Sequence, residues 1–457
     1  MCGMRAWHKA ALVPLLLAAC SQPREPLPTV VLVTLDTTRA DHLSTYGYGR
    51  ETDPFLRELA ARSRVFQIAV PTATWTLPSH ASMFTGLDPA EHGCWMRPDP
   101  EEPGEVLYPA LSPGLPTFTE RLRSAGYYLV GAVGGPFTSE AYGFARDFHA
   151  FEGPAQTETR SAVDLNRWIF ETLEERPPDS PLFLFVNYFD AHAPYWAPPG
   201  SYPFPRGPEG VPRELPGVPS LGRLALERLA PDEETVQLAV DQYDRSLLHL
   251  DRCLEELYGR LREEGLLERA LVIVTSDHGE SFGEHGTYSH GGLPREPLAR
   301  VPLVIESLPG GPADRVAEPV SLRNLATTIL AAAELPDLPP GGAGPGLDLL
   351  DLPPVLPPAY CEQRLPDLWV GVLRSERFKY GRTLSRLAGD PVELLLDLVA
   401  DPGETGAVPG GGDALREAEH LRRELLELRS SWRPEPEAVA GPRLTAKQRE
   451  TLRALGY

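Results

Sequence analysis

Three short apolar runs, each followed closely by acidic or imidazole side chains, constrain the fold of this 457-residue chain most strongly. The runs are Val30–Val33, Phe183–Val186 and Leu271–Val274. Continuous apolar runs of this length are typical of strands buried within a parallel sheet. Asp36 follows the first run, Asp190 and His192 follow the second, and Asp277-His278 follows the third. Because open α/β sheets bind ligands at the carboxyl ends of their strands, this pattern predicts a hydrolytic metal site.

Strands and helical periods alternate from Thr29 to about Leu308, which predicts an α/β fold with a mainly parallel sheet. Helices are expected near 116–125, over 233–264 and over 322–333, and a strand over 127–133. Beyond a proline- and glycine-rich stretch at 335–358, we expect a hairpin (370–374 with 377–380), a strand (394–398), a charged helix (413–430) and a short terminal helix. The expected organisation is a signal peptide (1–19), a lipidated linker (20–28), a catalytic domain (29–350), a C-terminal α+β subdomain (351–405) and a helical tail (406–457).

The N-terminus has the pattern of an export signal. Arg5 and Lys9 precede an apolar run from Ala10 to Ala19, which is too short to span a bilayer as a helix. The run ends in Leu17-Ala18-Ala19-Cys20, which resembles the lipobox of bacterial lipoproteins. The alternative is an ordinary signal peptide that contains a cysteine. We expect an exported lipoprotein that is anchored to a membrane through lipidated Cys20.

The charge of the chain excludes one class of partner. A net charge of −21 argues against sequence-independent nucleic-acid binding, which requires clustered cations. Besides Cys20, three cysteines follow the predicted cleavage site (Cys94, Cys253 and Cys361), and their odd number and wide spacing predict no disulfide framework. The proline-rich stretches at 96–116 and 194–219 are expected to be surface loops that shape a substrate cleft.

A second motif places a hydroxyl at the start of a helix. The segment Thr72–Gly86 predicts a short helix with Pro78 in its first turn and a glycine at its end. Thr76 would lie near the helix N-terminus, where backbone N–H groups favour an anion. Its hydroxyl is then placed to attack a phosphorus or sulfur centre. The alternative is that this hydroxyl only caps the helix.

Together these segments resemble the sulfatase family of the alkaline phosphatase superfamily. Val31–Asp41 is similar to its first metal-binding strand, and Thr275–Glu280 to its second. Thr76-Leu77-Pro78-Ser79-His80 falls where the family has its nucleophile motif, Cys or Ser-x-Pro-Ser-Arg. The segment 187–194, the segment 285–303 and the closing element 393–404 also match. The resemblance implies an alkaline-phosphatase-like central sheet flanked by helices and a smaller C-terminal α+β subdomain.

The departures from the family pattern bear on the chemistry. Active sulfatases need a cysteine or serine that is oxidised to formylglycine, and the extra methyl of Thr76 makes that aldehyde unavailable. Cys94 lies outside the motif, and the active-site lysines of the family are missing. His80 stands where the motif has arginine, and Thr37 where many members have a second aspartate. A threonine nucleophile is what the resembling phosphodiesterases and phosphoryl-headgroup transferases use.

The resemblance implies a role for each candidate residue. Asp36, Asp277, His278 and the Thr76 oxygen would bind one divalent cation, and these ligands do not choose among Ca, Mn, Zn and Mg. His192 and His290 would bind substrate oxygens and protonate the leaving group. Further candidates for substrate contact or a second metal are Asp190, His80, Arg39 and His285.

Three hypotheses follow. The favoured one is a metal-dependent ester hydrolase that acts on a phosphoester through a covalent Thr76 intermediate, with headgroup transfer as a variant. The second is a sulfuric ester hydrolase, and the third is a catalytically inactive lipoprotein that binds an anion. The expected substrate is a small anionic ester, a glycan or a lipid headgroup.

Overall fold

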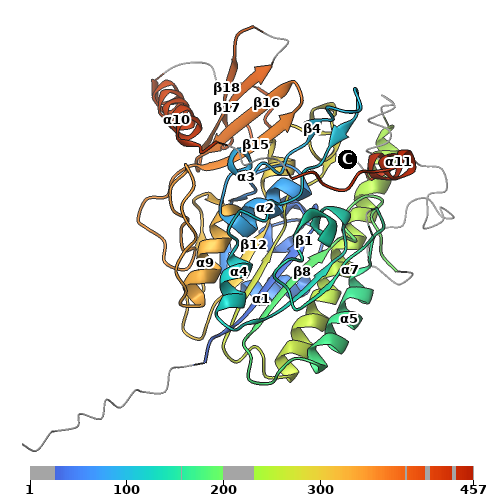
Figure 1. Cartoon of the computed structure of the whole chain (residues 1–457). Coiled ribbons are helices and arrows are strands. Elements are labelled where there is room, and N and C mark those ends of the chain that lie inside the picture. The colour runs from blue at the N-terminus through green and yellow to red at the C-terminus, as the bar shows by residue number, and fades with distance from the viewer. Residues whose placement is uncertain are drawn as a thin grey trace, which may run out of the picture.

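A mainly parallel sheet of eight strands forms the centre of the computed structural model, which describes residues 26–155, 157–198, 231–385, 389–406, 412–434 and 439–455 (Figure 1). The strand order is β13-β2-β12-β9-β1-β8-β6-β7, and β12 is the one antiparallel member among them. The strands are β1 (Thr29–Leu35), β2 (Arg64–Phe66), β6 (Tyr128–Val133), β7 (Ala150–Glu152), β8 (Leu182–Tyr188), β9 (Ala270–Thr275), β12 (Leu303–Glu306) and β13 (Arg315–Val316). The predicted α/β class is confirmed.

The three strands that carry the polar segments are direct neighbours. β1 lies between β8 and β9 and is parallel to both, with Val33 opposite Val186 and Val274. All their residues are buried, which explains the continuous apolar runs. Because the strands are parallel and in register, the residues that follow them lie at the same sheet edge.

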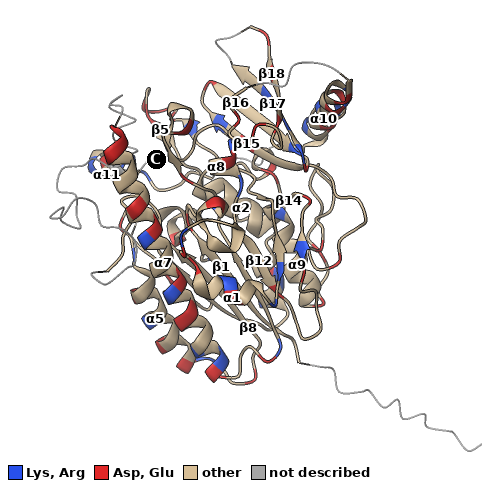
Figure 2. Cartoon of the chain, turned by 180° about the vertical axis from the view of Figure 1, so that it is seen from behind, with Lys and Arg blue, Asp and Glu red and all other residues tan. Residues whose placement is uncertain are grey.

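Helices cover both faces of the sheet. Alternate β1 residues point to opposite faces: Val30 and Leu32 pack with α2, α4 and α9, whereas Val31 and Val33 pack with α1, α5 and α7. In Figure 2, the outer helices α5, α7 and α10 carry many acidic and basic residues, whereas the central strands are almost free of charge. The helices are α1 (Pro54–Ala60), α2 (Thr76–Thr85), α3 (Pro89–His92), α4 (Phe118–Ser124), α5 (Ala162–Glu174), α7 (Glu233–Glu263), α8 (Glu296–Ala299), α9 (Leu325–Ala332), α10 (Gly412–Ser431) and α11 (Ala446–Ala454).

A second, antiparallel sheet of four strands follows in the C-terminal part (Figure 1). Its strands are β15 (Ala359–Leu365), β16 (Leu368–Arg374), β17 (Phe378–Ser385) and β18 (Val392–Asp397). The predicted hairpin is present as β16–β17, and α10 packs on these two strands. Short pairs elsewhere are β3 (Ala69–Val70) with β14 (Val320–Ser321), β4 (Arg97–Pro98) with β5 (Val106–Leu107), and β10 (Ser281–Phe282) with β11 (Tyr288–Ser289).

Some sequence expectations fall outside the described part of the chain. The signal peptide at 1–19 and the lipidation candidate Cys20 lie there, as does 199–219 of the second proline-rich stretch. Among the described residues, no helix combines the length and apolar character that a membrane span requires.

Candidate functional site

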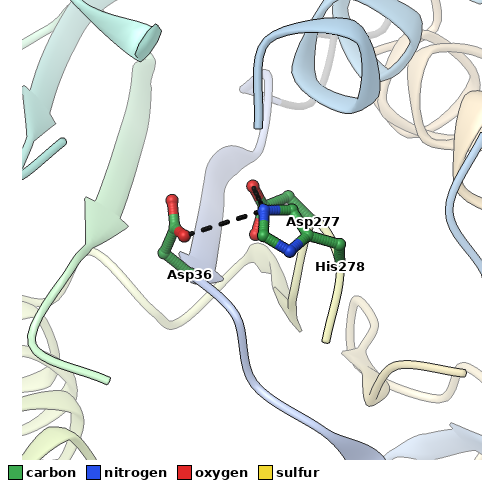
Figure 3. A group of neighbouring side chains, drawn as sticks. All are labelled: Asp36, Asp277 and His278. Atoms are coloured by element: carbon green, nitrogen blue, oxygen red, sulfur yellow. Dashed lines mark ion pairs between the residues drawn. The ribbon is translucent and has the colours of Figure 1, made fainter. Parts of the chain in front are cut away.

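Asp36, Asp277 and His278 meet at the carboxyl edge of the central sheet (Figure 3). Asp36 directly follows β1, and the other two follow β9. His278 Nε2 lies 3.4 Å from Asp277 Oδ2 and 3.9 Å from Asp36 Oδ1. His278 Nδ1 is 2.9 Å from the Gly279 carbonyl, an acceptor that requires the proton on Nδ1. With Nδ1 protonated, a neutral ring leaves Nε2 free to act as a metal ligand on the side of the two carboxylates.

The three side chains fit a divalent cation. One ligand atom from each lies within 4.8 Å of the others, and all three side chains are buried. Asp36 Oδ1 and Asp277 Oδ2 accept no hydrogen bond within the described part of the chain. Burial raises the pKa of Asp36 well above its usual value, and the neighbouring Asp277 raises it further. A bound cation would compensate the negative charge of these two buried carboxylates.

Thr76 begins α2 beside this cluster. Its Oγ1 lies 3.2 Å from His278 Nε2. Ser79 Oγ donates to the Asp277 carbonyl at 2.7 Å, which fixes α2 against the loop after β9. The predicted proline lies in the first turn, and Gly86 ends the helix in the left-handed conformation at φ 69°. The sequence therefore predicts both the helix and the position of its hydroxyl at the N-terminus.

His192 and His290 extend the cluster on the side of His278. The His290 ring centroid lies 4.7 Å from that of His192 and 4.7 Å from that of His278. Burial lowers the pKa of both imidazoles well below the usual value, and the neighbouring histidines lower it further. Both rings are therefore neutral in this state, and an anionic substrate between them would favour their protonation.

Two other candidates lie away from this cluster. Asp190 faces α5 and α7: its Oδ2 accepts from the Ala162 amide at 2.9 Å, and its Oδ1 lies 3.6 Å from His249 Nε2. His285 is exposed on the loop that precedes β11. The structure therefore brings neither residue to the three ligands.

Arg39 and His80 are buried supports of the site. Arg39 pairs with Asp41 at 2.7 Å and Glu284 at 2.6 Å, and it donates to the Glu280 carbonyl at 3.0 Å. His80 lies one turn after Thr76, with Nδ1 3.0 Å from the Thr76 carbonyl and 3.4 Å from Asp277 Oδ2. Burial lowers the His80 pKa, so a neutral ring takes the place of the family arginine.

Sequence reasoning missed two polar residues of the site. Glu280 is fully buried, its Oε1 lies 3.5 Å from His290 Nδ1, and neither oxygen accepts a hydrogen bond from the described residues. Burial raises the pKa of Glu280 to about 8. Asn187 Nδ2 donates to Thr34 Oγ1 at 3.0 Å and to Asp36 Oδ2 at 3.4 Å. Both residues lie near the carboxyl ends of predicted strands, so their position in the sequence could have identified them as candidates.

A close backbone approach explains the glycine between His278 and Glu280. A Cβ at Gly279 would lie 1.9 Å from the Pro297 carbonyl oxygen in α8. The Gly279 amide also donates to the Leu298 carbonyl at 3.0 Å. The tight fit holds the loop after β9 against α8 and so fixes its two polar neighbours.

Comparisons with known proteins agree with this geometry. The family model described as Sulfatase matches residues 28–335. The chain is 24% identical to an arylsulfatase of Clostridium perfringens over 394 residues, covering 71% of this chain and 78% of that one. It is 26% identical to arylsulfatase A of Homo sapiens over 500 residues, covering 87% and 88%.

Solved structures share the fold. A phosphonate monoester hydrolase of Agrobacterium radiobacter matches with a TM-score of 0.68 at 20% identity, covering 88% of this chain and 95% of that one. The 2-O GAG sulfatase BT1596 matches with a TM-score of 0.69 at 17% identity, covering 89% and 92%. At this identity the likeness establishes the architecture of the chain.

Proposed function

Because the chain belongs to the sulfatase family and is an ester hydrolase, we propose that Thr76 is its nucleophile and that a phosphoester is its favoured substrate. The observation that carries this proposal is the position of Thr76 Oγ1, 3.2 Å from His278 Nε2 at the N-terminus of α2. A hydroxyl there adjoins the carboxylate pair and faces the positive end of a helix dipole. Both features suit attack on an anionic ester.

The threonine favours phosphate over sulfate as the ester that is cleaved. Formylglycine gives sulfatases an easy way to release sulfate, and Thr76 cannot form it. A threonyl sulfate would be hard to resolve, whereas threonyl phosphate esters are ordinary hydrolytic intermediates. Sulfate ester hydrolysis is the second candidate because the family is named for it. An inactive anion-binding protein is disfavoured, since Asp36, Asp277 and His278 are all present and close together.

The proposed reaction has two displacements. Asp36, Asp277, His278 and the Thr76 oxygen would hold a divalent cation, whose positive charge would lower the pKa of the threonine hydroxyl. The Thr76 hydroxyl loses its proton to solvent, and its Oγ1 forms a bond to phosphorus while the bond from phosphorus to the substrate alcohol breaks. The leaving alcohol takes a proton from His192 or His290, one of which the bound anionic substrate has caused to take up a proton from solvent. Water then attacks the threonyl ester, releases phosphate and restores the hydroxyl. Transfer to an acceptor alcohol is the variant in which that alcohol replaces water.

The two histidines bind the non-bridging oxygens in this scheme. The His290 ring lies beside His278, which contacts Thr76, and the His192 ring lies beside His290, so a phosphoryl group at Thr76 would extend toward both rings. Glu280, 3.5 Å from His290 Nδ1, orients that ring from behind. The buried position of all three groups strengthens their interactions with a developing charge.

Export and lipidation belong to the same proposal. Leu17-Ala18-Ala19-Cys20 supports a mature chain that is anchored through Cys20, with the substrate outside the cytoplasm. Lipid headgroups and glycans would then be within reach of the site. Mass spectrometry of the detergent-extracted protein tests this, because acylation at residue 20 is expected in the wild type and is lost in Cys20→Ser.

The test of the nucleophile uses the secreted form that begins after Cys20. Bound metal is measured, and aryl phosphate, phosphodiester and sulfate ester substrates are assayed before and after chelation. Thr76→Ala is expected to lower phosphoester turnover at least about a thousandfold, because it removes the attacking oxygen. Thr85→Ala is the matched control: Thr85 is also buried, at the opposite end of α2, with its hydroxyl bonded to the Ala81 carbonyl.

The possible results distinguish among the three hypotheses. Full turnover in Thr76→Ala would overturn the nucleophile assignment. Sulfate esters turned over faster than phosphate esters would replace the favoured substrate with the second candidate. Metal-free protein without turnover on any ester would favour the anion-binding hypothesis.

A further inference from the structure

A cavity lies near the C-terminal end of α2, away from Thr76, where the central and C-terminal sheets meet. Its volume is about 430 Å³, within the range of small-molecule sites. Its walls come from η6 (Leu322–Asn324), the strands β14, β15 and β16, the helix α10 and the proline- and glycine-rich stretch that the sequence marks as a linker. Thr76 and Asp88, which follows α2, are separated by the whole helix, so this cavity is distinct from the candidate ester site.

The charged groups around the cavity favour a cation. Asp88, Glu424 and Glu427 line it, and Arg323 is the cationic residue among the lining groups. The Arg323 guanidinium donates to the carbonyls of Gly86 at 3.1 Å and Ala343 at 3.2 Å, so its hydrogen bonds are directed into the wall.

Asp88 supplies an acceptor atom without a protein donor. Its side chain is fully buried, Oδ2 accepts from Trp432 Nε1 at 3.4 Å, and Oδ1 has no hydrogen-bond partner within the described chain. Burial raises the Asp88 pKa to about 6, which leaves the carboxylate largely ionised at neutral pH. A buried carboxylate oxygen without a donor is costly, and a ligand N–H would remove that cost.

Much of the remaining lining is apolar, and Ser321, Asn324, Tyr360 and Ser431 add uncharged polar groups to it. Prolines and leucines form much of the wall, including Pro345, Leu347, Pro358, Leu373 and Leu428. Among the residues that the structure describes, the only group of His, Cys, Asp and Glu close enough to hold a metal is Asp36, Asp277 and His278. The single carboxylate of Asp88 provides fewer oxygen ligands than a hard cation such as Ca²⁺ or Mg²⁺ requires.

We propose that this cavity binds a small organic ammonium compound. The ammonium group donates to Asp88 Oδ1, and an alkyl or aryl body packs against the prolines and leucines of the wall. Glu424 and Glu427 on α10 attract the cation at the mouth. This site does not depend on the reaction at Thr76.

Titration calorimetry with benzylammonium tests the proposal, with benzyl alcohol as the uncharged probe of similar shape. The full mature chain is expected to bind benzylammonium saturably and to bind the alcohol at least about tenfold more weakly. Asp88→Asn keeps the shape of the side chain and is expected to weaken benzylammonium binding by about tenfold or more. Ala343→Trp fills the cavity from its half-buried wall and is expected to abolish binding.

Two controls separate the site from other effects. Asp390→Asn removes an exposed carboxylate elsewhere and is expected to bind the probe as the wild type does. Thr76→Ala is expected to bind it equally well, so failure of the nucleophile assignment would leave this proposal intact. The absence of saturable binding, or equal affinity in wild type, Asp88→Asn and Ala343→Trp, would overturn it.

Discussion

At Glu280, the effect of the acidic group can be tested without changing the volume of the side chain. It is fully buried, and its carboxylate lies 3.5 Å from His290 Nδ1. Glu280→Gln preserves the volume but removes the acid that faces the ring. We expect kcat to fall about 10- to 100-fold with bound metal unchanged, as for other residues that orient a catalytic histidine. Steady-state kinetics and metal analysis measure the two effects separately.

The control for Glu280 lies four residues further along the chain, just beyond β10. Glu284 pairs with Arg39 at 2.6 Å, and its side chain is 35% exposed. Glu284→Gln is expected to retain most of the activity. Equal kcat values in the two variants would show that the contact between Glu280 and His290 has no part in turnover.

Asp251 gives a prediction about stability and pH. It accepts hydrogen bonds from the Phe55 and Leu56 amides at the start of α1, yet burial raises its pKa from 3.8 to about 7. The folded state therefore binds a proton between about pH 4 and 7 that the unfolded state has lost. Its contribution to stability is complete below the unfolded pKa and disappears as the pH rises through about 7.

Asp251→Asn removes this titration. The fall in the free energy of unfolding between pH 5 and 7 should become shallower by up to about 1.4 kcal/mol per pH unit. Urea unfolding at pH 5, 6 and 7 measures the slope, with exposed Asp390→Asn as the control. Parallel slopes in wild type and Asp251→Asn would contradict the prediction.

At the scale of single residues, the sequence predicts those that directly follow strands. Asp36, Asp277 and His278 meet because their strands are parallel neighbours, which the apolar runs already indicate. The positions of residues on loops are harder to predict, because no local sequence pattern determines the path of the chain there. Arg39 and His285 show this: one is paired with nearby acids and the other is exposed.

Among the secondary-structure elements, β17 and α8 are joined by a buried ion network. Lys379 Nζ lies 2.7 Å from Glu296 and 2.9 Å from Glu404. Although burial opposes it, Lys379 and Arg374 lower the Glu296 pKa to about 2. The network fixes the C-terminal sheet against the segment that follows the His290 loop.

Lys379→Met should therefore destabilise the protein by about 3–5 kcal/mol, because it leaves buried carboxylates without their cation. The free energy of unfolding in urea measures this. Arg416→Met is the control, since Arg416 pairs with Asp413 on the exposed face of α10 and its side chain is 75% exposed. Such a pair contributes little, so a similar loss in both variants would contradict the role of the buried network.

Helices and strands with a regular pattern of apolar residues can be predicted from the sequence. β15 lacks such a pattern. The long helix is expected over 233–264 and is observed over Glu233–Glu263. β15 contains Glu362, Gln363 and Arg364, which interrupt any apolar run, so the sequence pattern predicts no strand there. Tertiary partners stabilise it instead, including β16 and the segment before Thr76.

Across the whole molecule, β15 joins the two sheets close to the candidate site. The Glu362 amide donates to the Thr72 carbonyl at 2.8 Å, and Gln363 donates to the Gly291 carbonyl. These contacts hold the segment that leads to Thr76 and the residue after His290. Cys361, Val370 and Val372 also pack against Ile68 and Val70 of the catalytic part.

A chain that ends at residue 356 is therefore expected to lose function. Removing β15 frees both segments, and a displacement of about 1 Å at a catalytic group can cost about a hundredfold in rate. We expect at least that loss in kcat, together with a lower melting temperature, because Ile68 and Val70 become exposed. Since all these contacts are noncovalent, residues 357–457 supplied as a separate chain should restore part of the turnover. Unchanged kcat and melting temperature in the shortened chain would instead show that residues before 357 form an independent catalytic unit.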